Sequence, residues 1–366
     1  MKCRLASWLL GSMLATATTL NGAEPGTARY SMPVANRAIQ LRPLDDKHPS
    51  PVLTALRLTP DGRWVVAAGD DHVVRIIDVQ SGKLSKEIRG HRDWVETVAV
   101  SPDGRWLGTA GNDHRVVVWE LASGKSRWKT DVLAGPVSNI EFSHDGSKLA
   151  VAGFGQPLQL FDAITGTRIR QLPCPCRDMR SIAFSPDDLH LAGGGRNGRL
   201  RIWDLQTGNE LATYPAHQQR IRAITFDPTG QHLITASEDR TIKIWDWESN
   251  EELFQLNHNG GKVMSLSLLP HDRLASAGSD NVICIWDLQT RRCLSLLRGH
   301  KGSIAALDAN PRVLVSSGFD ATLRLWPLDE MDAALTQLEH ARSEQLTRDS
   351  RIENATQATS QLAPRP

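Results

Sequence analysis

Three sets of side chains in this chain combine the residue types of a hydrolase. Each set contains a histidine, a serine or threonine and an aspartate, the types that a serine hydrolase uses for nucleophilic catalysis. Each set also includes a tryptophan, and all three occupy matching positions of a sequence repeat. A catalytic site is expected once, so the repetition favours an architectural role. The sets are His91, Thr109, Asp113 and Trp119; His217, Thr235, Asp239 and Trp245; and His300, Ser316, Asp320 and Trp326.

Other catalytic patterns are missing. The sequence contains no G-x-S-x-G elbow, phosphate-binding loop, H-E-x-x-H pair or dinucleotide fingerprint. The pairs Asp71-His72 and Asp113-His114 resemble metal ligands, but they recur because the turns recur, and each histidine is expected in solvent. We therefore expect no catalytic residue, no metal and no cofactor.

Four cysteines follow the N-terminal segment. Cys174 and Cys176 lie in a loop and could hold a metal or form a local or intermolecular disulfide, although no further ligand stands at a suitable spacing. Cys284 and Cys293 fall on neighbouring predicted strands. Counting along that hairpin places Cys284 opposite about Leu297, so both thiols are expected to be reduced and buried.

A repeat of about forty residues organises the chain. A strand-like phrase such as LRIWDLQTGN recurs around residues 77, 119, 161, 203, 245, 286 and 326. Each unit reads as four short strands joined by polar turns, among them TPDG, SPDG and SHDG, in which proline and glycine favour the turn. Repeated four-stranded antiparallel units predict an all-β fold, a β-propeller with seven blades.

The seven registered repeats resemble the WD-repeat family of seven-bladed β-propellers over roughly residues 38–328. The resemblance implies that each of the three sets above forms a buried polar network. In that network an indole N–H meets the hydroxyl, the hydroxyl meets the imidazole, and the imidazole meets the carboxylate.

Some repeats depart from this pattern. Blade 1 has Ala67 and Ile77 at network positions, blade 3 has Val151, Gly155 and Phe161, and blade 4 has Gly193 and Asn197. Blade 6 keeps Ser276, Asp280 and Trp286, with either His258 or Asn259 facing them. Blade 7 lacks an outermost strand, so we predict that residues 38–44 supply it and close the ring.

The surface around one mouth of the central channel is the candidate binding site, because WD-repeat relatives commonly bind partners there. Tryptophan and arginine are enriched at interface hot spots, and Trp94 is the sharpest candidate, with packing on a neighbouring loop as the alternative. Arg180, Arg220, Arg222 and Lys262 predict a side that prefers an acidic ligand; a solvated rim is the alternative. The full set is Trp94, Glu96, Asp178, Arg180, Arg220, Arg222, Lys262 and Met264 from first strands, and Asp70, Asn112, Phe154, Arg196, Glu238 and Phe319 from turns.

The two ends of the chain differ from the repeats. Residues 1–23 have the basic, apolar and small-residue order of a secretory signal peptide, with an uncleaved anchor as the alternative. Residues 24–37 read as a linker. Residues 329–346 predict a short amphipathic helix, packed on the propeller flank or docking a partner, and residues 347–366 a disordered tail.

These patterns predict a secreted or periplasmic, monomeric propeller that acts as a non-enzymatic scaffold for a protein or peptide partner. A formal net charge of +1 argues against nucleic acid and anionic membranes. Two alternatives remain open: an exported hydrolase or lyase that uses the channel mouth, and a binder of an acidic peptide or sugar.

Overall fold

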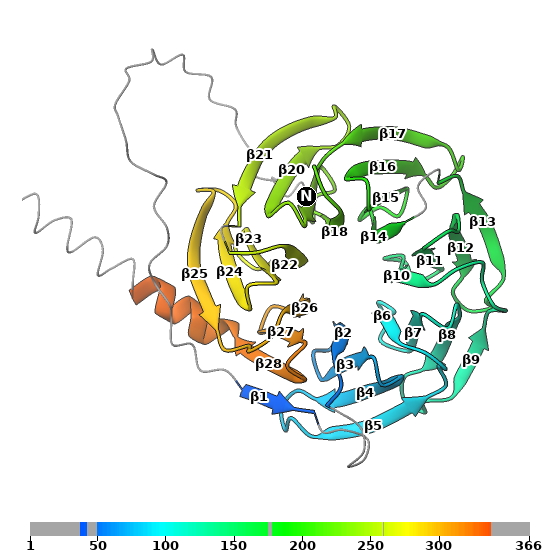
Figure 1. Ribbon diagram of the computed structural model, residues 1–366, viewed down its shortest axis with the longest axis horizontal. Helices are drawn as coiled ribbons and strands as arrows, with labels where there is room; N and C mark the ends of the chain where they lie inside the picture. Colours follow the sequence, from blue (N-terminus) through cyan, green and yellow to red (C-terminus); the bar gives the residue numbers. More distant parts are fainter. Residues whose placement is uncertain (1–36, 42–49, 175–177, 259, 338–366) are drawn as a thin grey trace, which may run out of the picture.

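The protein forms a closed ring of seven four-stranded antiparallel sheets (Figure 1). The structure is a computed structural model that describes residues 37–41, 50–174, 178–258 and 260–337. The predicted signal peptide, most of the predicted linker, the predicted disordered tail and Cys176 lie outside these residues. The sheets are the predicted blades, so the all-β propeller is confirmed.

The strands follow one another from the channel outwards in each blade. Blade 1 comprises β2 (Leu53–Leu58), β3 (Trp64–Gly69), β4 (Val73–Asp78) and β5 (Leu84–Arg89). Blade 2 comprises β6 (Val95–Val100), β7 (Trp106–Gly111), β8 (Val116–Glu120) and β9 (Ser126–Lys129). Blade 3 comprises β10 (Val137–Phe142), β11 (Lys148–Gly153), β12 (Leu158–Asp162) and β13 (Arg168–Leu172). Blade 4 comprises β14 (Met179–Phe184), β15 (His190–Gly195), β16 (Arg199–Asp204) and β17 (Glu210–Pro215).

The remaining blades repeat this order. Blade 5 comprises β18 (Ile221–Phe226), β19 (His232–Ser237), β20 (Thr241–Asp246) and β21 (Glu251–Asn257). Blade 6 comprises β22 (Val263–Leu269), β23 (Arg273–Gly278), β24 (Val282–Asp287) and β25 (Arg292–Arg298). Blade 7 comprises β26 (Ile304–Ala309), β27 (Val313–Gly318), β28 (Thr322–Pro327) and, from the other end of the chain, β1 (Arg37–Gln40).

In blades 1 to 4 a serine or threonine forms a hydrogen-bonded turn just before the second strand. In blade 2 the Ser101 hydroxyl donates to Asp103 at 2.6 Å and accepts the N–H of Trp106 at 2.9 Å. Gly104 completes the turn with φ of 70°, a conformation that glycine adopts without a steric cost. Thr59, Ser143 and Ser185 hold equivalent turns. The repeated turn motif therefore sets the same hairpin in successive blades.

The hydrophobic core lies between blades. Each buried cluster joins the middle strands of one blade to the first strands of the next, as where Val66 and Ile76 of blade 1 pack with Val98 and Leu107 of blade 2. Strands buried on both faces read as nearly continuous apolar runs. A blade alone could not bury these faces, so the ring folds as one unit.

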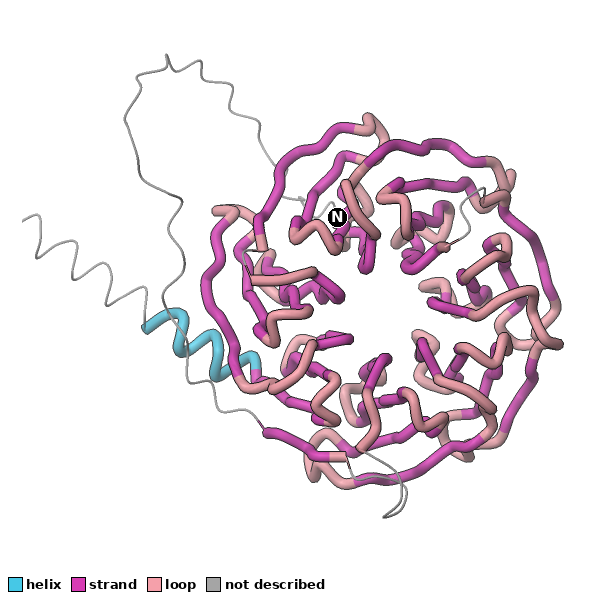
Figure 2. Tube along the Cα trace, viewed as in Figure 1, coloured by secondary structure: helices cyan, strands magenta, loops and turns pink. Residues whose placement is uncertain are grey.

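Blade 7 is completed by β1, and a helix that follows β28 packs against blades 6 and 7. β1 pairs antiparallel with β28, from Arg37 opposite Leu325 to Gln40 opposite Thr322, which confirms the predicted closure. The strand ends at Gln40, earlier than predicted. A helix over residues 328–337 follows β28, and its Leu328 and Met331 are buried against blades 6 and 7. Figure 2 shows this helix beside the ring.

The helix lies on the propeller flank, the first of the two predicted positions. Arg273 forms an ion pair with Asp332 of the helix at 2.6 Å. Within the described ranges, no helix has the length and hydrophobicity needed to cross a membrane.

Candidate interaction site at the channel mouth

The three complete polar networks lie inside their blades. In blade 2, the Trp119 indole donates to Thr109 at 2.8 Å, Thr109 lies 2.7 Å from His91 Nε2, and His91 Nδ1 lies 2.9 Å from Asp113. Blade 5 repeats this chain of contacts through Thr235, and blade 7 through Ser316. In each, the tryptophan, the hydroxyl and the histidine are buried.

This geometry assigns the hydroxyls to structure. Each hydroxyl accepts from an indole, so the arrangement differs from a nucleophile facing a substrate pocket. Burial would raise the pKa of Asp113, but hydrogen bonds from His91 and from backbone N–H groups outweigh it and lower that pKa. Burial also lowers the pKa of His300, which favours the neutral imidazole within the network.

Blade 6 resolves an alternative that the sequence left open. His258 fills the network position, with Nε2 at 3.1 Å from Asp280 and Nδ1 at 3.3 Å from the Ser276 hydroxyl. Its ring is therefore turned relative to those of His91 and His217. Asn259 lies outside the described residues.

The incomplete blades replace the network with other contacts. In blade 4 the Trp203 indole donates to the carbonyl of Pro173 at 3.0 Å. In blade 1 Asp71 forms an ion pair with buried Arg75. His72 and His114 occupy turn positions with φ of 65° and 61° and are half-buried, so the expectation that they sit in solvent was wrong in degree.

The two cysteines of blade 6 correct a prediction. Cys284 pairs with Leu296, one residue from the predicted partner Leu297, and a bulge between Cys293 and Ser295 makes Trp286 pair with Cys293. The two thiols interact: this contact and burial raise the pKa of Cys284, while the same contact lowers that of Cys293. Cys293 is half-buried, not buried, and it and Cys284 are free thiols.

A cavity of about 480 Å³ occupies the central channel, and the seven first strands line it. Every first strand carries a register shift after its first residue, so its second residue falls outside the regular pairing. A β-bulge re-aims the side chain at that position. Glu96, Arg180, Arg222 and Met264 all stand at such second positions and all line the cavity.

The predicted mouth residues divide into two groups. Those that line the cavity are Trp94, Glu96, Arg180, Arg222, Met264 and Phe319. The others do not line the cavity. Four of them form ion pairs: Asp178, Arg220, Glu238 and Lys262. The remaining four make local contacts: Asn112 hydrogen-bonds Glu96, Phe154 packs against Arg180, the N–H of Arg196 donates to the carbonyl of Asp178, and Asp70 accepts the N–H of Val52.

An ion-pair network interleaves the basic cluster with acids. Arg220 bridges Asp178 at 3.2 Å and Glu238 at 3.1 Å, and Glu238 also contacts Lys262 at 3.1 Å. Arg180 pairs with Asp178 at 3.0 Å and lies 4.0 Å from the centre of the Phe154 ring. Much of the predicted positive charge is therefore neutralised locally.

Arg222 is the least compensated of the four cations in this cluster that the structure describes. Its ion pair with Glu238 spans 3.8 Å, near the limit of such contacts. Burial, Arg180 and Arg220 lower the pKa of Arg222, while Glu238 and Glu96 oppose this effect. Its positive charge is thus held in a site that does not fully stabilise it.

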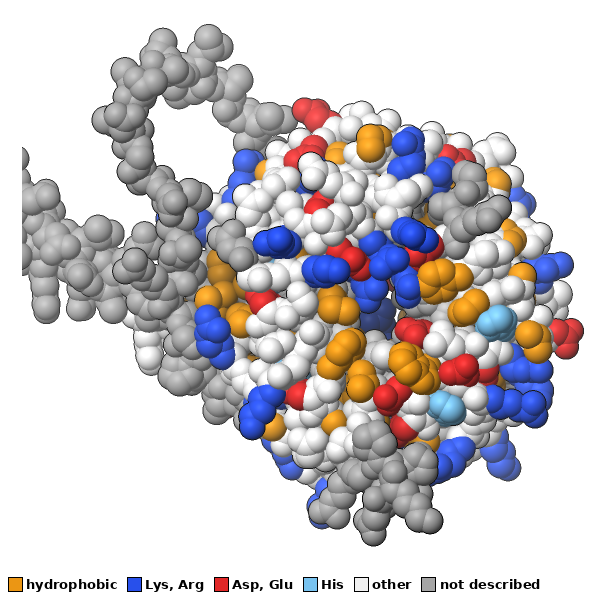
Figure 3. All heavy atoms as spheres, viewed as in Figure 1, with side chains coloured by type: hydrophobic (Ala, Val, Ile, Leu, Met, Phe, Trp, Pro, Cys, Tyr) orange, Lys and Arg blue, Asp and Glu red, His pale blue; other side chains and the backbone are white. Residues whose placement is uncertain are grey.

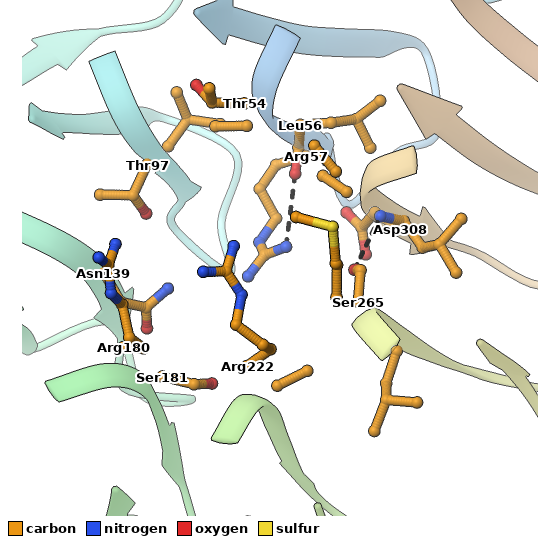
Figure 4. Close-up of a pocket in the computed structure, with 18 of the residues that line it drawn as sticks. Thr54, Leu56, Arg57, Thr97, Asn139, Arg180, Ser181, Arg222, Ser265 and Asp308 are labelled. Carbon is orange, nitrogen blue, oxygen red and sulfur yellow. Dashed lines mark hydrogen bonds between the residues drawn. The ribbon is translucent and has the colours of Figure 1, made fainter. Parts of the chain in front are cut away.

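Deeper in the channel lie charged residues that the sequence reasoning missed. Arg57, Glu141 and Asp308 occupy the fifth position of β2, β10 and β26 and line the cavity. Figure 4 shows Arg57 and Arg222 projecting into this space, with Arg180 at its edge beside Asn139. The shared fifth position was a signal available in the repeat.

The two deep acids tie neighbouring blades together. Asp308 accepts the N–H of Leu58 at 2.7 Å, and Glu141 accepts the N–H of Phe184. Burial raises the pKa of Glu141 to about 8 and that of Asp308 above its usual range, although Arg57 opposes both shifts. The third positions also tie blades, as where the Ser181 hydroxyl accepts the N–H of Ile224 at 3.0 Å.

Two large apolar side chains are exposed at this mouth. Trp94 is 46% exposed and Phe319 is 47% exposed, and both line the cavity. Trp94 therefore keeps an accessible surface at the mouth. Figure 3 shows basic side chains gathered on one side of the central hollow and hydrophobic ones on the other.

Comparison with known families agrees with this architecture. The WD40 model, described as WD domain, G-beta repeat, matches residues 41–78, 82–120, 166–204, 208–246, 250–287 and 291–327, more than half of the chain.

The chain belongs to the WD40 repeat family.

The matches pass over residues 121–165, which hold most of blade 3, where Val151 and Phe161 replace the network residues. A comparison with curated proteins finds no match. WD40 propellers are commonly protein-interaction scaffolds and are typically non-catalytic.

Proposed function

We propose that this WD40 propeller is a non-enzymatic scaffold that binds a protein or peptide partner at the channel mouth formed by β6, β14, β18 and β22. The observation that carries the proposal is the pairing of exposed Trp94 and Phe319 with the charged rim around one cavity. A surface with accessible aromatic anchors beside arginines matches the composition of interface hot spots.

The absence of catalysis is part of this proposal. The histidine, hydroxyl and aspartate sets are committed to indole donors inside the blades, which supports a structural use of these residues. The proposal also places the protein in a secreted or periplasmic compartment, supported by the order of residue types in residues 1–23.

The test is partner capture from the exported fraction of the host, with the immobilised propeller as bait. The double variant Trp94→Ala/Arg222→Gln should lose a captured partner, because it removes the aromatic anchor and one channel arginine. The matched control is Ile169→Ala/Arg168→Gln, which changes two exposed residues of the outer strand β13. Equal capture by both variants and the unchanged protein would refute the proposal.

A further inference from the structure

The channel mouth contains a carboxylate that competes for the channel arginines. Glu96, Arg180 and Arg222 all come from bulged second positions of first strands and line the same cavity. Glu96 interacts electrostatically with both arginines. One internal carboxylate therefore faces two guanidinium groups whose other partners lie at the rim.

Arg180 and Arg222 differ in how closely an acidic partner approaches them. Arg180 has Asp178 at 3.0 Å, whereas Arg222 has only Glu238 at 3.8 Å as an ion-pair partner within the described residues. Two arginines that line one cavity and interact electrostatically favour the binding of an anion there, since carboxylates bind guanidinium by paired hydrogen bonds.

We propose that Arg180 and Arg222 form a subsite for a carboxylate side chain of an acidic peptide, and that the nearby Glu96 competes with this peptide through its electrostatic interaction with both arginines. This inference rests on the proposed function, since it names the chemistry of the partner that the mouth takes. The aromatic side chains of Trp94 and Phe319 at the same mouth contact the apolar part of that peptide.

Competition by Glu96 makes binding depend on pH. The groups that act on Glu96 are Arg180 and Arg222, the Asn112 side chain and Asp93. Burial is the largest effect and raises the pKa of Glu96 above 4.5, with Asp93 adding to the shift. As the pH falls from neutral, Glu96 takes up a proton before exposed glutamates do, so the arginines become available while the peptide remains charged.

The experiment measures fluorescence polarisation of labelled hexaglutamate and hexalysine peptides at low salt, at about pH 7.5 and about pH 5.5. Glu96→Gln should tighten hexaglutamate binding roughly tenfold at the higher pH and reduce its pH dependence, because the competing charge is gone. Arg222→Gln should weaken binding roughly tenfold, since it removes one of the two cations. Arg168→Gln, an exposed arginine on β13, is the control and should leave binding unchanged.

A gain of affinity in Glu96→Gln is a result that a damaged fold cannot produce. Hexaglutamate binding no tighter than hexalysine binding, or a Glu96→Gln variant with unchanged or weaker binding, overturns the subsite. The two proposals fail separately. If partner capture depends on Trp94 but hexaglutamate does not bind, only the subsite is refuted. If hexaglutamate binds with the expected variant effects but partner capture does not depend on the mouth residues, only the scaffold role is refuted.

Discussion

Replacing Thr235 with valine tests whether the buried polar network stabilises the ring. The Thr235 hydroxyl accepts from the Trp245 indole at 3.0 Å and lies 2.8 Å from His217 Nε2. Thr235 is fully buried, and its two partners are nearly so. Valine keeps the size of the side chain, so the substitution removes hydrogen bonds without opening a cavity.

The expected cost follows from the groups left without partners. A buried donor or acceptor that loses its hydrogen bond costs about 1–3 kcal/mol, and two such groups remain on Trp245 and His217. We therefore expect Thr235→Val to lower the free energy of unfolding by about 2–6 kcal/mol. Urea unfolding followed by tryptophan fluorescence and far-UV circular dichroism measures this difference.

Thr235→Ser is the matched control, because serine already fills the same network position as Ser276 and Ser316 in blades 6 and 7. It keeps the hydroxyl and removes one methyl group, which should cost only about 1 kcal/mol. The reasoning is refuted if Thr235→Val is no less stable than Thr235→Ser. A double-mutant cycle that combines Thr235→Val with Trp245→Phe then measures the coupling free energy between the indole and the hydroxyl. Additive changes in the free energy of unfolding would show that the two groups are not coupled.

Three further predictions follow from other parts of the ring. Deletion of residues 1–41, which removes β1, should lower the melting temperature by several degrees relative to deletion of residues 1–36, which keeps β1 paired with β28; equal melting temperatures would show that closure does not depend on this strand. Glu141→Gln should raise the free energy of unfolding by about 3–5 kcal/mol above pH 8 and change it little below about pH 4.5. The pKa of Glu141 is raised from 4.5 to about 8, so as the pH rises between these values the unfolded state ionises while the folded state keeps the proton, and the wild-type protein loses stability over this whole range; unfolding curves across it give the sign directly. Cys293 should react with iodoacetamide before Cys284, because the contact between their thiols lowers the pKa of Cys293 and raises that of Cys284, and peptide mass spectrometry that finds Cys284 labelled first would contradict this order.

Much of the architecture could be predicted because the same local sequence pattern recurs along the chain. The strand phrase recurs seven times and the turn motif around Gly104 recurs in the first five blades, so the missing outer strand of blade 7 stands out against the repeat. The network residues His91, Thr109 and Trp119 could be placed for the same reason, since each repeat supplies an independent alignment of its equivalents.

The channel was less predictable. The sequence indicated which residues stand near the mouth, but not that Arg220 and Lys262 would be held by Glu238. The Lys262–Glu238 pair joins blades 6 and 5, and the Arg220–Asp178 pair joins blades 5 and 4, so their distances depend on how far successive sheets are rotated about the axis. The same is true of Glu141 and Asp308, whose partners Phe184 and Leu58 lie in the next blade.

The sequence by itself determined the number of blades, the order of strands within each and the network that fixes every complete blade, because these depend on patterns within about forty residues. Only the tertiary structure decided which side chains share the channel and how their charges compensate one another. A bulge in every first strand turns Glu96, Arg180 and Arg222 inwards, and ring closure then brings these residues of three separate repeats around one cavity. Such proximity arises from the rotation between blades, which no local pattern encodes.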